Sequence, residues 1–467
     1  MKWCWMKQSV KKQEIKEQRK GLYSAFFPMY IALVLQNVVT ISVNLADNIM
    51  LGSYSETALS GVAAVNQIQF VYQQLLMAFG DGMVIFCSQY WGKKQIEPMK
   101  KIAAGAMRFG IGLAAVLFIA MSLLPGQAVG LFTYDQAIIA EGVKYLNIIR
   151  FTYPFFAVTV LLLATLRSVE TVKIAFYLSI MTFFVNCGIN YVLIYGHFGA
   201  PQMGTAGAAV GTLTARILEV MVLICYICFH EKHLKMTWKD YLHVDRSVTK
   251  DYLKITTPML IVQGLWGMNT ALQTVVLGHM NAAAIAANSV ASTLFLVVKS
   301  TGVGAASATS VIIGKTIGLG DMKLVKRYAK ELQKIFVVIG ITFGIVLFFI
   351  RIPILNLYQL APDTRAMANT FLMILSVVYV GTAYQMPVNN GIIRGGGTTE
   401  YVLVLDLVSI WCIVIPLSFL MAFVVKASPV VVVCCLNADQ LFKCIPSFFK
   451  VNFGKWAKIL TKETVNG

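Results

Sequence analysis

Acidic residues and histidines are scarce in this chain. Asp and Glu together number 21 in 467 residues, and the five histidines are spread along the sequence. An enzyme that uses magnesium needs clustered carboxylates, and one that uses a nucleophile needs a histidine placed beside it. The sequence contains neither pattern, so it argues against an enzyme.

Paired cysteines are nearly absent as well. The nine cysteines form one CxxC, Cys225 and Cys228, which lies inside an apolar run with no second pair nearby. We therefore expect neither a metal centre nor a redox cofactor. The alternating segments of a membrane barrel are missing too. Residues 1–20 are basic and lack an apolar core followed by a cleavage site, which predicts an uncleaved cytoplasmic segment.

Long apolar runs dominate the sequence instead. It is 58% hydrophobic and only 13% charged, and runs of about 20 residues, enough to cross a bilayer, recur from end to end. The net charge of +18 is not gathered in one patch but falls in every second connection, as the positive-inside rule predicts. These features predict an all-α polytopic protein of the plasma membrane, with twelve transmembrane helices, both termini cytoplasmic and no nucleic-acid partner. Among these spans, the second covers about residues 58–90, the fourth 138–165, the seventh 257–277, the tenth 366–386 and the twelfth 429–442.

The two halves of the chain repeat each other at an offset of 226 residues. Leu51-Gly52 matches Leu277-Gly278, Lys100-Lys101 matches Lys326-Arg327, and Arg167 matches Arg394 at offset 227. Parallel repeats of six spans imply two lobes, with substrate bound near the middle of the membrane. We predict a basic segment at 1–20, lobes at 21–229 and 255–445, a cytoplasmic linker at 230–254 and a basic tail at 446–467.

The first long apolar run closes with Val43–Gly52, and Asp47 is the only acid in that run. Asn37, Thr40 and Asn44 precede it at helical spacing and share its stripe. A carboxylate inside a membrane span is costly, so it usually faces protein or a water-filled cavity and serves function. The alternative is a buried acid tied to a neighbouring helix for structure alone. Gln273 replaces Asp47 in the second half, which places ion coupling in the amino-terminal lobe.

Further polar residues fall within the predicted spans. Those assigned to a substrate cavity are Asn37, Thr40, Asn44, Asn66, Gln69, Gln73, Gln263, Thr270, Gln273 and Tyr384. In span two, either the stripe of Asn66, Gln69 and Gln73 or that of Gln67, Gln74 and Asp81 should face this cavity.

The remaining charged residues of the spans have structural alternatives. Asp81 serves transport or pairs with Lys299 or Arg150. Arg216 and Glu219 pair with each other or serve transport, and their spacing favours pairing. Asp406 is either a second proton site or a helix-pairing acid. Arg167 and Arg394 either bind the carbonyls that end spans four and ten, which we favour, or form a gate.

Several motifs together resemble the multidrug and toxic-compound extrusion (MATE) family over about residues 21–458. They are D-x4-G from Asp47, QYWGKK at Gln89–Lys94, R-x3-T-x-K from Arg167, N-x3-N-Y-x-L-I-Y-G from Asn186, G-x2-G-A-A from Gly204, and RGGGT from Arg394. The resemblance implies export of small organic, often cationic and amphipathic compounds, driven by Na⁺ or H⁺. We expect the protein to be a monomer and to use no other cofactor.

The resemblance also implies a cation site in the amino-terminal lobe. Carried over to this chain, its residues are Asp47, Asn186, Asn190 and Thr212, and any Na⁺ would bind at Asp47. Asn190 stands where many members have an aspartate, and the acids of spans seven and ten of some members are absent. Both departures leave Na⁺ versus H⁺ open.

A flippase or exporter of lipid-linked oligosaccharide or polysaccharide shares this architecture and is the alternative function. Such a protein should carry basic residues in its first spans to hold a pyrophosphate. This chain has none between Lys20 and Lys93, which counts against the alternative.

Overall fold

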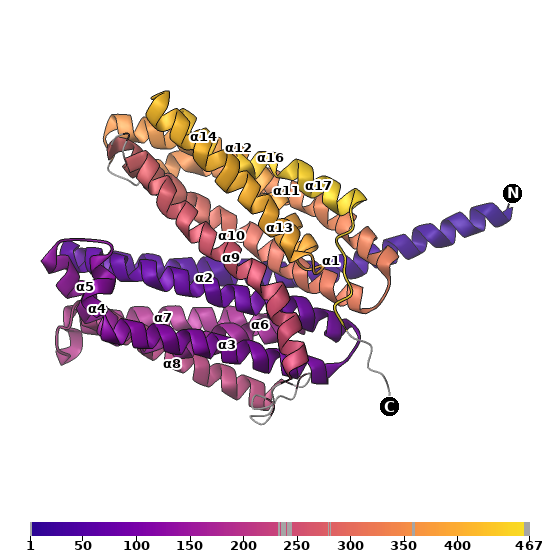
Figure 1. The fold of residues 1–467 in the computed structure, drawn as a ribbon, viewed down its shortest axis with the longest axis horizontal. Helices are drawn as coiled ribbons and strands as arrows, with labels where there is room; N and C mark the ends of the chain where they lie inside the picture. Colours follow the sequence, from indigo (N-terminus) through magenta and orange to yellow (C-terminus); the bar gives the residue numbers. More distant parts are fainter. Residues whose placement is uncertain are drawn as a thin grey trace. The chain divides into compact units, whose positions relative to one another are not determined.

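The computed structural model describes residues 2–231, 234, 240, 245–278, 280, 282–356 and 360–461, and within these it contains helices and turns but no strand (Figure 1). The chain packs into two compact units, one of residues 35–264 and one of residues 1–34 with 265–467. Two long helices, α1 (Lys2–Tyr54) and α9 (Arg246–Gly278), each contribute residues to both units.

The unit of residues 35–264, called the amino-terminal unit below, is a bundle of helices between the end of α1 and the start of α9. Its elements are α2 (Glu56–Gly92), α3 (Ile96–Leu123), α4 (Pro125–Gly130), α5 (Gln136–Ile149), α6 (Thr152–Ser168), α7 (Lys173–Tyr195), η1 (His197–Gly199) and α8 (Thr205–Phe229). Helix α2 packs against α3, α5 and α6, and α7 packs against α8. A Cβ added at Gly61 of α2 would lie 2.7 Å from the backbone nitrogen of Gly142, so glycine permits the close crossing of α2 and α5.

The other unit, called the carboxy-terminal unit, is also helical throughout the residues described. Its elements are α10 (Ala282–Gly318), α11 (Met322–Leu355), α12 (Pro362–Met386), η3 (Pro387–Ile393), α13 (Thr399–Asp406), η4 (Leu407–Val414), α14 (Ile415–Phe419), η5 (Leu420–Val424), α15 (Pro429–Leu436), α16 (Asp439–Phe442) and α17 (Cys444–Phe453). The segments η3, η4 and η5 are π-helical. Helix α12 packs against α10 and α11.

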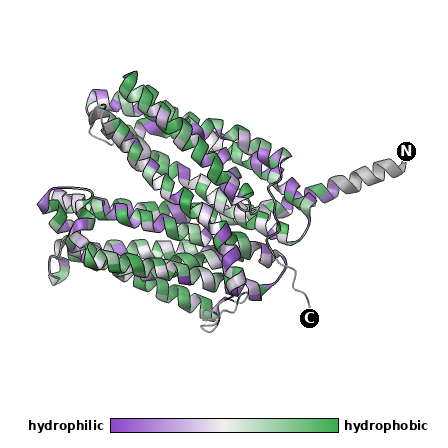
Figure 2. Ribbon diagram, viewed as in Figure 1, coloured by the Kyte–Doolittle hydropathy of each residue, from purple (hydrophilic) through white to green (hydrophobic). Residues whose placement is uncertain are grey.

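The helices of the described residues account for most of the twelve predicted spans by length and hydropathy. Among the described residues ten helices satisfy both criteria, and the pair α5–α6 makes an eleventh span. Helix α9 has 33 residues, which is also sufficient length. Hydrophobic residues run along the helices of both units (Figure 2), and large apolar side chains such as Leu123, Phe184 and Phe349 are about 70% exposed on their outer faces. A surface of this kind suits lipid, and the chain is a multi-pass membrane protein.

Two predicted spans differ in shape from the expectation. The fourth was expected to be one helix over residues 138–165, but it is broken into α5 and α6, which meet at 56°. Arg150 and Phe151 lie at the break, and the guanidinium of Arg150 rests over the ring of Phe151 at 5.5 Å. The twelfth was expected to end near residue 442, but helical residues continue to Phe453.

The predicted domain limits stay a prediction, because the packing units divide the chain inside helices. Helix α9 begins at Arg246, within the predicted linker. Residues 232–233, 235–239 and 241–244 of that linker, and residues 462–467 of the predicted tail, lie outside the described residues.

Candidate functional site

A chain of hydrogen bonds joins three helices in the amino-terminal unit. Asn190 Nδ2 donates to Asp47 Oδ1 at 2.7 Å and to Asn186 Oδ1 at 3.2 Å. Asn186 Nδ2 in turn donates to Thr212 Oγ1 at 3.2 Å. The four residues predicted as a cation site therefore lie together, with Asp47 on α1, the two asparagines on α7 and Thr212 on α8.

Local sequence explains why these residues meet. Asn186 and Asn190 are four residues apart and so occupy one face of α7. Both are buried, with 1% and 0% of their surface exposed. Helix α8 approaches this face at Gly211, where an added Cβ would lie only 2.0 Å from Asn190 Oδ1. Glycine at this position therefore lets α8 pass without displacing the Asn190 amide.

The donor set suits a hard cation. It offers a carboxylate, two amide oxygens and a hydroxyl, the oxygen ligands that such ions prefer. Asn190 Oδ1 is buried and accepts no hydrogen bond from the residues described. Unsatisfied buried acceptors are uncommon, so this oxygen is available to a ligand. Elsewhere in the described residues, no group of three or more His, Cys, Asp or Glu side chains is placed to hold a metal ion.

A cavity of about 60 Å³ opens beside this chain. Its lining residues are Val43, Asn44, Asp47, Leu51, Val62, Asn66, Gln69, Tyr72, Gln73, Tyr145, Thr152, Tyr153, Phe156, Ala208, Thr212 and Arg216. Of the two polar stripes on α2, the one formed by Asn66, Gln69 and Gln73 faces the cavity. Four of the ten residues predicted for a substrate cavity, those three and Asn44, line it.

The other six predicted cavity residues lie elsewhere. Asn37, Thr40 and Gln263 belong to the same unit but are not among the lining residues, and the Thr40 hydroxyl donates to the Gln36 carbonyl oxygen at 2.9 Å. Thr270, Gln273 and Tyr384 belong to the carboxy-terminal unit.

Three tyrosines that line the cavity were not predicted from the sequence. Tyr72 on α2, Tyr145 on α5 and Tyr153 on α6 are all buried, and the Tyr72 hydroxyl donates to the Tyr153 carbonyl oxygen at 2.7 Å. Nothing in the sequence separates them from other aromatic residues of the apolar runs, because their place depends on how α2, α5 and α6 pack.

Arg216 and Glu219 pair as predicted, but Arg216 also lines the cavity. Arg216 Nη1 lies 2.7 Å from Glu219 Oε2, and its guanidinium rests over the ring of Phe156 at 4.8 Å. The pairing follows from their spacing on α8. The position in the cavity does not, since it depends on α6, which carries Phe156.

Asp81 pairs with neither partner expected from the sequence. Its carboxylate lies 2.5 Å from Arg167 Nη2, on α6, instead of near Lys299 or Arg150. Arg167 was expected to bind helix carbonyls, and its contact with Asp81 shows that a side chain is its partner. This ion pair joins α2 to α6, which favours the structural interpretation of both residues.

Asp406 lies in an ion-pair network of the carboxy-terminal unit, which favours its interpretation as a helix-pairing acid. Lys443 Nζ lies 2.8 Å from Asp406 Oδ1 and 2.9 Å from Asp439 Oδ2, and Arg394 lies 3.8 Å from Asp406. Nearby amides extend the network, because Gln385 Nε2 donates to Gln440 Oε1 at 2.8 Å. Tyr384 lies apart from this network and donates to Gln333 Oε1 at 2.8 Å.

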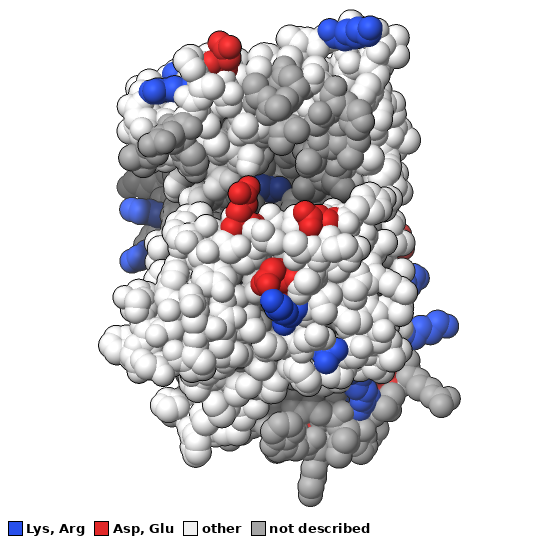
Figure 3. Space-filling model, turned by 90° about the vertical axis from the view of Figure 1, so that its left-hand side faces the viewer, with Lys and Arg blue, Asp and Glu red and all other residues white. Residues whose placement is uncertain are grey.

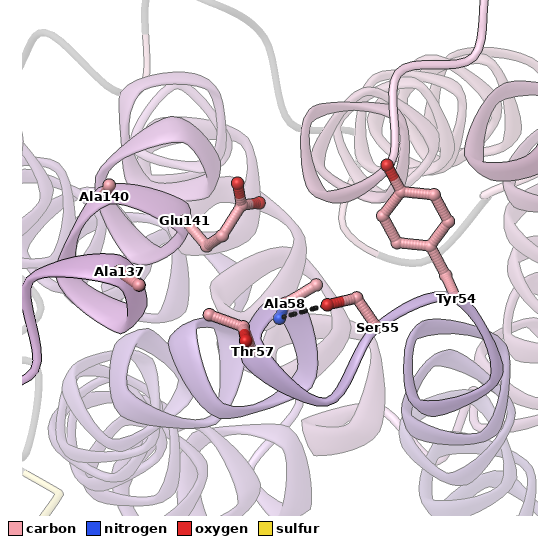
Figure 4. A pocket seen from close by; sticks show the side chains of 7 residues that line it. All are labelled: Tyr54, Ser55, Thr57, Ala58, Ala137, Ala140 and Glu141. Carbon is pink, nitrogen blue, oxygen red and sulfur yellow. Dashed lines mark hydrogen bonds between the residues drawn. The ribbon is translucent and has the colours of Figure 1, made fainter.

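A second pocket, of about 510 Å³, lies where α1 ends and α2 and α5 begin (Figure 4). It is lined by Tyr54, Ser55, Thr57, Ala58, Ala137, Ala140 and Glu141. Figure 3 shows acidic and basic side chains among the mostly uncharged described residues of the face it draws. Glu141 is already engaged, because Lys144 Nζ lies 2.6 Å from its Oε1 and the Thr205 hydroxyl donates to its Oε2. We therefore place the candidate site at Asp47.

The fold and this membrane-embedded polar site define the chain as a helical membrane transporter built from two units. The MatE family model matches residues 32–192 and 258–420, two segments that begin 226 residues apart, at the offset of the internal repeat. The chain belongs to this family, the multidrug and toxic-compound extrusion transporters.

Individual relatives match most or all of the chain. It is 24% identical to the probable multidrug resistance protein NorM of Thermotoga maritima over 100% of this chain and 99% of that protein. A variant of the MATE transporter VcmN of Vibrio cholerae superposes with a TM-score of 0.85 at 14% identity, covering 93% of this chain and 97% of that one. A transporter of the MOP superfamily from Pyrococcus furiosus gives 0.82 at 16% identity, covering 91% and 94%.

Proposed function

We propose that this protein is a secondary active antiporter that exports organic, cationic and amphipathic compounds across the plasma membrane in exchange for Na⁺ or H⁺. It works as a monomer with both termini in the cytoplasm. Asp47 binds the coupling cation, and Asn186, Asn190 and Thr212 complete the site. The hydrogen-bond chain from Asp47 to Thr212, on the wall of a cavity, is the observation that carries this proposal.

The chemistry follows from the charges that this cavity holds. Asp47 is its one acidic lining residue, so its carboxylate attracts a cation, and the buried amides replace part of the water that the ion leaves behind. Occupation of Asp47 removes the unpaired charge from the membrane interior, which lowers the energy of moving the lobe. Alternating access then links cation entry to cargo export.

A flux assay in liposomes tests the proposal. Purified protein is reconstituted, a fluorescent organic cation is loaded, and Na⁺ and H⁺ gradients are imposed separately on wild type and on Asp47→Asn. We expect one gradient to drive dye movement in wild type and Asp47→Asn to abolish it. Asp363→Asn, an exposed acid of α12, is the matched control and should transport like wild type.

Two results would contradict the proposal. Full transport in a well-folded Asp47→Asn variant would make Asp47 a structural acid. No movement of any dye under either gradient would favour the oligosaccharide flippase. That alternative has little support in the cavity, because its only basic lining residue, Arg216, is paired with Glu219 and not open to a pyrophosphate.

A further inference from the structure

Arg216 is the one basic residue among those that line the cavity beside Asp47. It lies on the same face of α8 as Thr212, four residues earlier, and Glu219, three residues later. Thr212 is the end of the hydrogen-bond chain that starts at Asp47. A full positive charge therefore stands about one helix turn, roughly 5–6 Å along the axis, from the proposed cation site.

The guanidinium is held in place from two sides. Glu219 accepts its hydrogen bond at 2.7 Å and is only 4% exposed, and the Phe156 ring lies 4.8 Å from the guanidinium carbon. If Arg216 moved away, it would leave a buried carboxylate without a partner, which is strongly unfavourable. Arg216 is thus a fixed charge and not a mobile one.

The other titratable groups around Asp47 are neutral at physiological pH. They are Tyr72 on α2, Tyr145 on α5, Tyr153 on α6 and Cys187 on α7. Thiols and phenols ionise only well above pH 7. Among the described residues that line this cavity and their ion-pair partners, Arg216 and Glu219 are therefore the charged groups that act on the Asp47 carboxylate.

We propose that Arg216 determines how tightly the cavity binds its coupling cation, and that Glu219 moderates this effect. The guanidinium repels a cation arriving at Asp47, which keeps the affinity low enough for the ion to be released on the other side of the membrane. Glu219 offsets part of that repulsion and holds the guanidinium against Phe156. This inference rests on the proposed antiport function. It adds Arg216, a residue that tunes cation affinity without contacting the cation.

Three variants separate charge from packing. Glu219→Gln leaves Arg216 uncompensated, so the cation concentration for half-maximal transport should rise about tenfold, as expected for one buried unit charge at this range. Arg216→Gln with Glu219→Gln removes the pair together, so half-maximal transport should occur at or below the wild-type concentration. Arg216→Lys keeps the charge but loses the planar contact with Phe156, so a half-maximal concentration near the wild-type value would assign the effect to charge, not to packing.

Each variant is measured in two ways. Dye efflux from liposomes gives the half-maximal Na⁺ concentration or pH, and cation-dependent thermal stabilisation in detergent gives equilibrium binding without transport. Asp47→Asn should show neither response. The paired variant leaves no unpaired buried charge and therefore keeps the test valid if a single variant folds poorly.

The outcomes distinguish failure of the proposed antiport function from failure of the inference about Arg216. A wild type without any cation response overturns the proposed function and this inference with it. A responsive wild type overturns the inference alone if the half-maximal concentration is unchanged in a folded Glu219→Gln variant or raised in the paired variant. Equal losses in all three variants would show that Arg216 only packs α8 against α6.

Discussion

Gly211 offers the sharpest test of the candidate site, because α8 passes Asn190 so closely there. A Cβ at Gly211 would lie 2.0 Å from Asn190 Oδ1 and 3.1 Å from Asn190 Cγ. Packed atoms do not approach below about 3 Å, so Gly211→Ala forces the amide to move by roughly 1 Å. The Asn190–Asp47 hydrogen bond, now 2.7 Å, would then stretch beyond bonding distance.

The size of the effect follows from that bond. A hydrogen bond to a charged group contributes about 1.5–3 kcal/mol, and 1.36 kcal/mol is a tenfold change in an equilibrium constant. We expect Gly211→Ala to lower gradient-driven transport at subsaturating cation by about tenfold or more. Liposome efflux under the active gradient measures this.

Gly188 on α7 supplies a matched control, since an added Cβ there would meet nothing within 4 Å. Replacing glycine by alanine raises helix propensity by about 1 kcal/mol in both variants, so thermal unfolding should show that Gly211→Ala and Gly188→Ala are both folded. The reasoning is refuted if Gly211→Ala transports as well as Gly188→Ala.

Three further predictions concern ion pairs outside the site. Lys443→Met leaves Asp406 and Asp439 without their shared cation, so it should lower the free energy of unfolding by about 3–5 kcal/mol. Lys426→Met, at an exposed position, is the control and should change the free energy of unfolding little. Equal shifts of the melting temperature in the two variants would contradict this prediction. A double-mutant cycle on Asp81 and Arg167 should give a coupling free energy under about 1 kcal/mol, because the Asp81 side chain is 41% exposed to solvent. A larger coupling free energy would contradict this and indicate that the ion pair is shielded from water. Hydrogen bonds from the Val248 backbone N–H and then from Lys101 lower the pKa of the Asp245 carboxyl. The ionised carboxylate therefore stabilises the fold at neutral pH, and this stabilisation is lost as the pH falls below about 4. Asp245→Ala should have a lower melting temperature than wild type at pH 7, and the difference should narrow in acid.

Residue spacing along single helices predicted much of the candidate site. The stripe of Asn66, Gln69 and Gln73, the Asn186–Asn190 pair and the Arg216–Glu219 pair each follow from one helical period, and all three hold in the structure. Apolar runs predicted the membrane helices for the same reason, since length and composition are local properties.

Features that depend on two helices meeting were not predictable in this way. Asp81 finds Arg167 and not Lys299 or Arg150, because α2 packs against α6 at that depth. The cavity tyrosines and the place of Arg216 beside Asp47 arise from the same packing. Asp439 and Lys443 are a partial exception, because their spacing of four marks them as partners on one helical face, a signal that sequence reasoning passed over.

The π-helical turns of the carboxy-terminal unit bear on how the two halves should be aligned. The family segments begin 226 residues apart, at 32 and 258, but end 228 apart, at 192 and 420, and Arg167 and Arg394 lie 227 apart. The turn η3 directly precedes Arg394, and η4 lies between Arg394 and residue 420. A π-helical turn holds one residue more than an α-helical turn. Each step in the offset equals the one extra residue that a π-helical turn holds, and a single offset does not pair the side chains of the two halves from Arg394 onward.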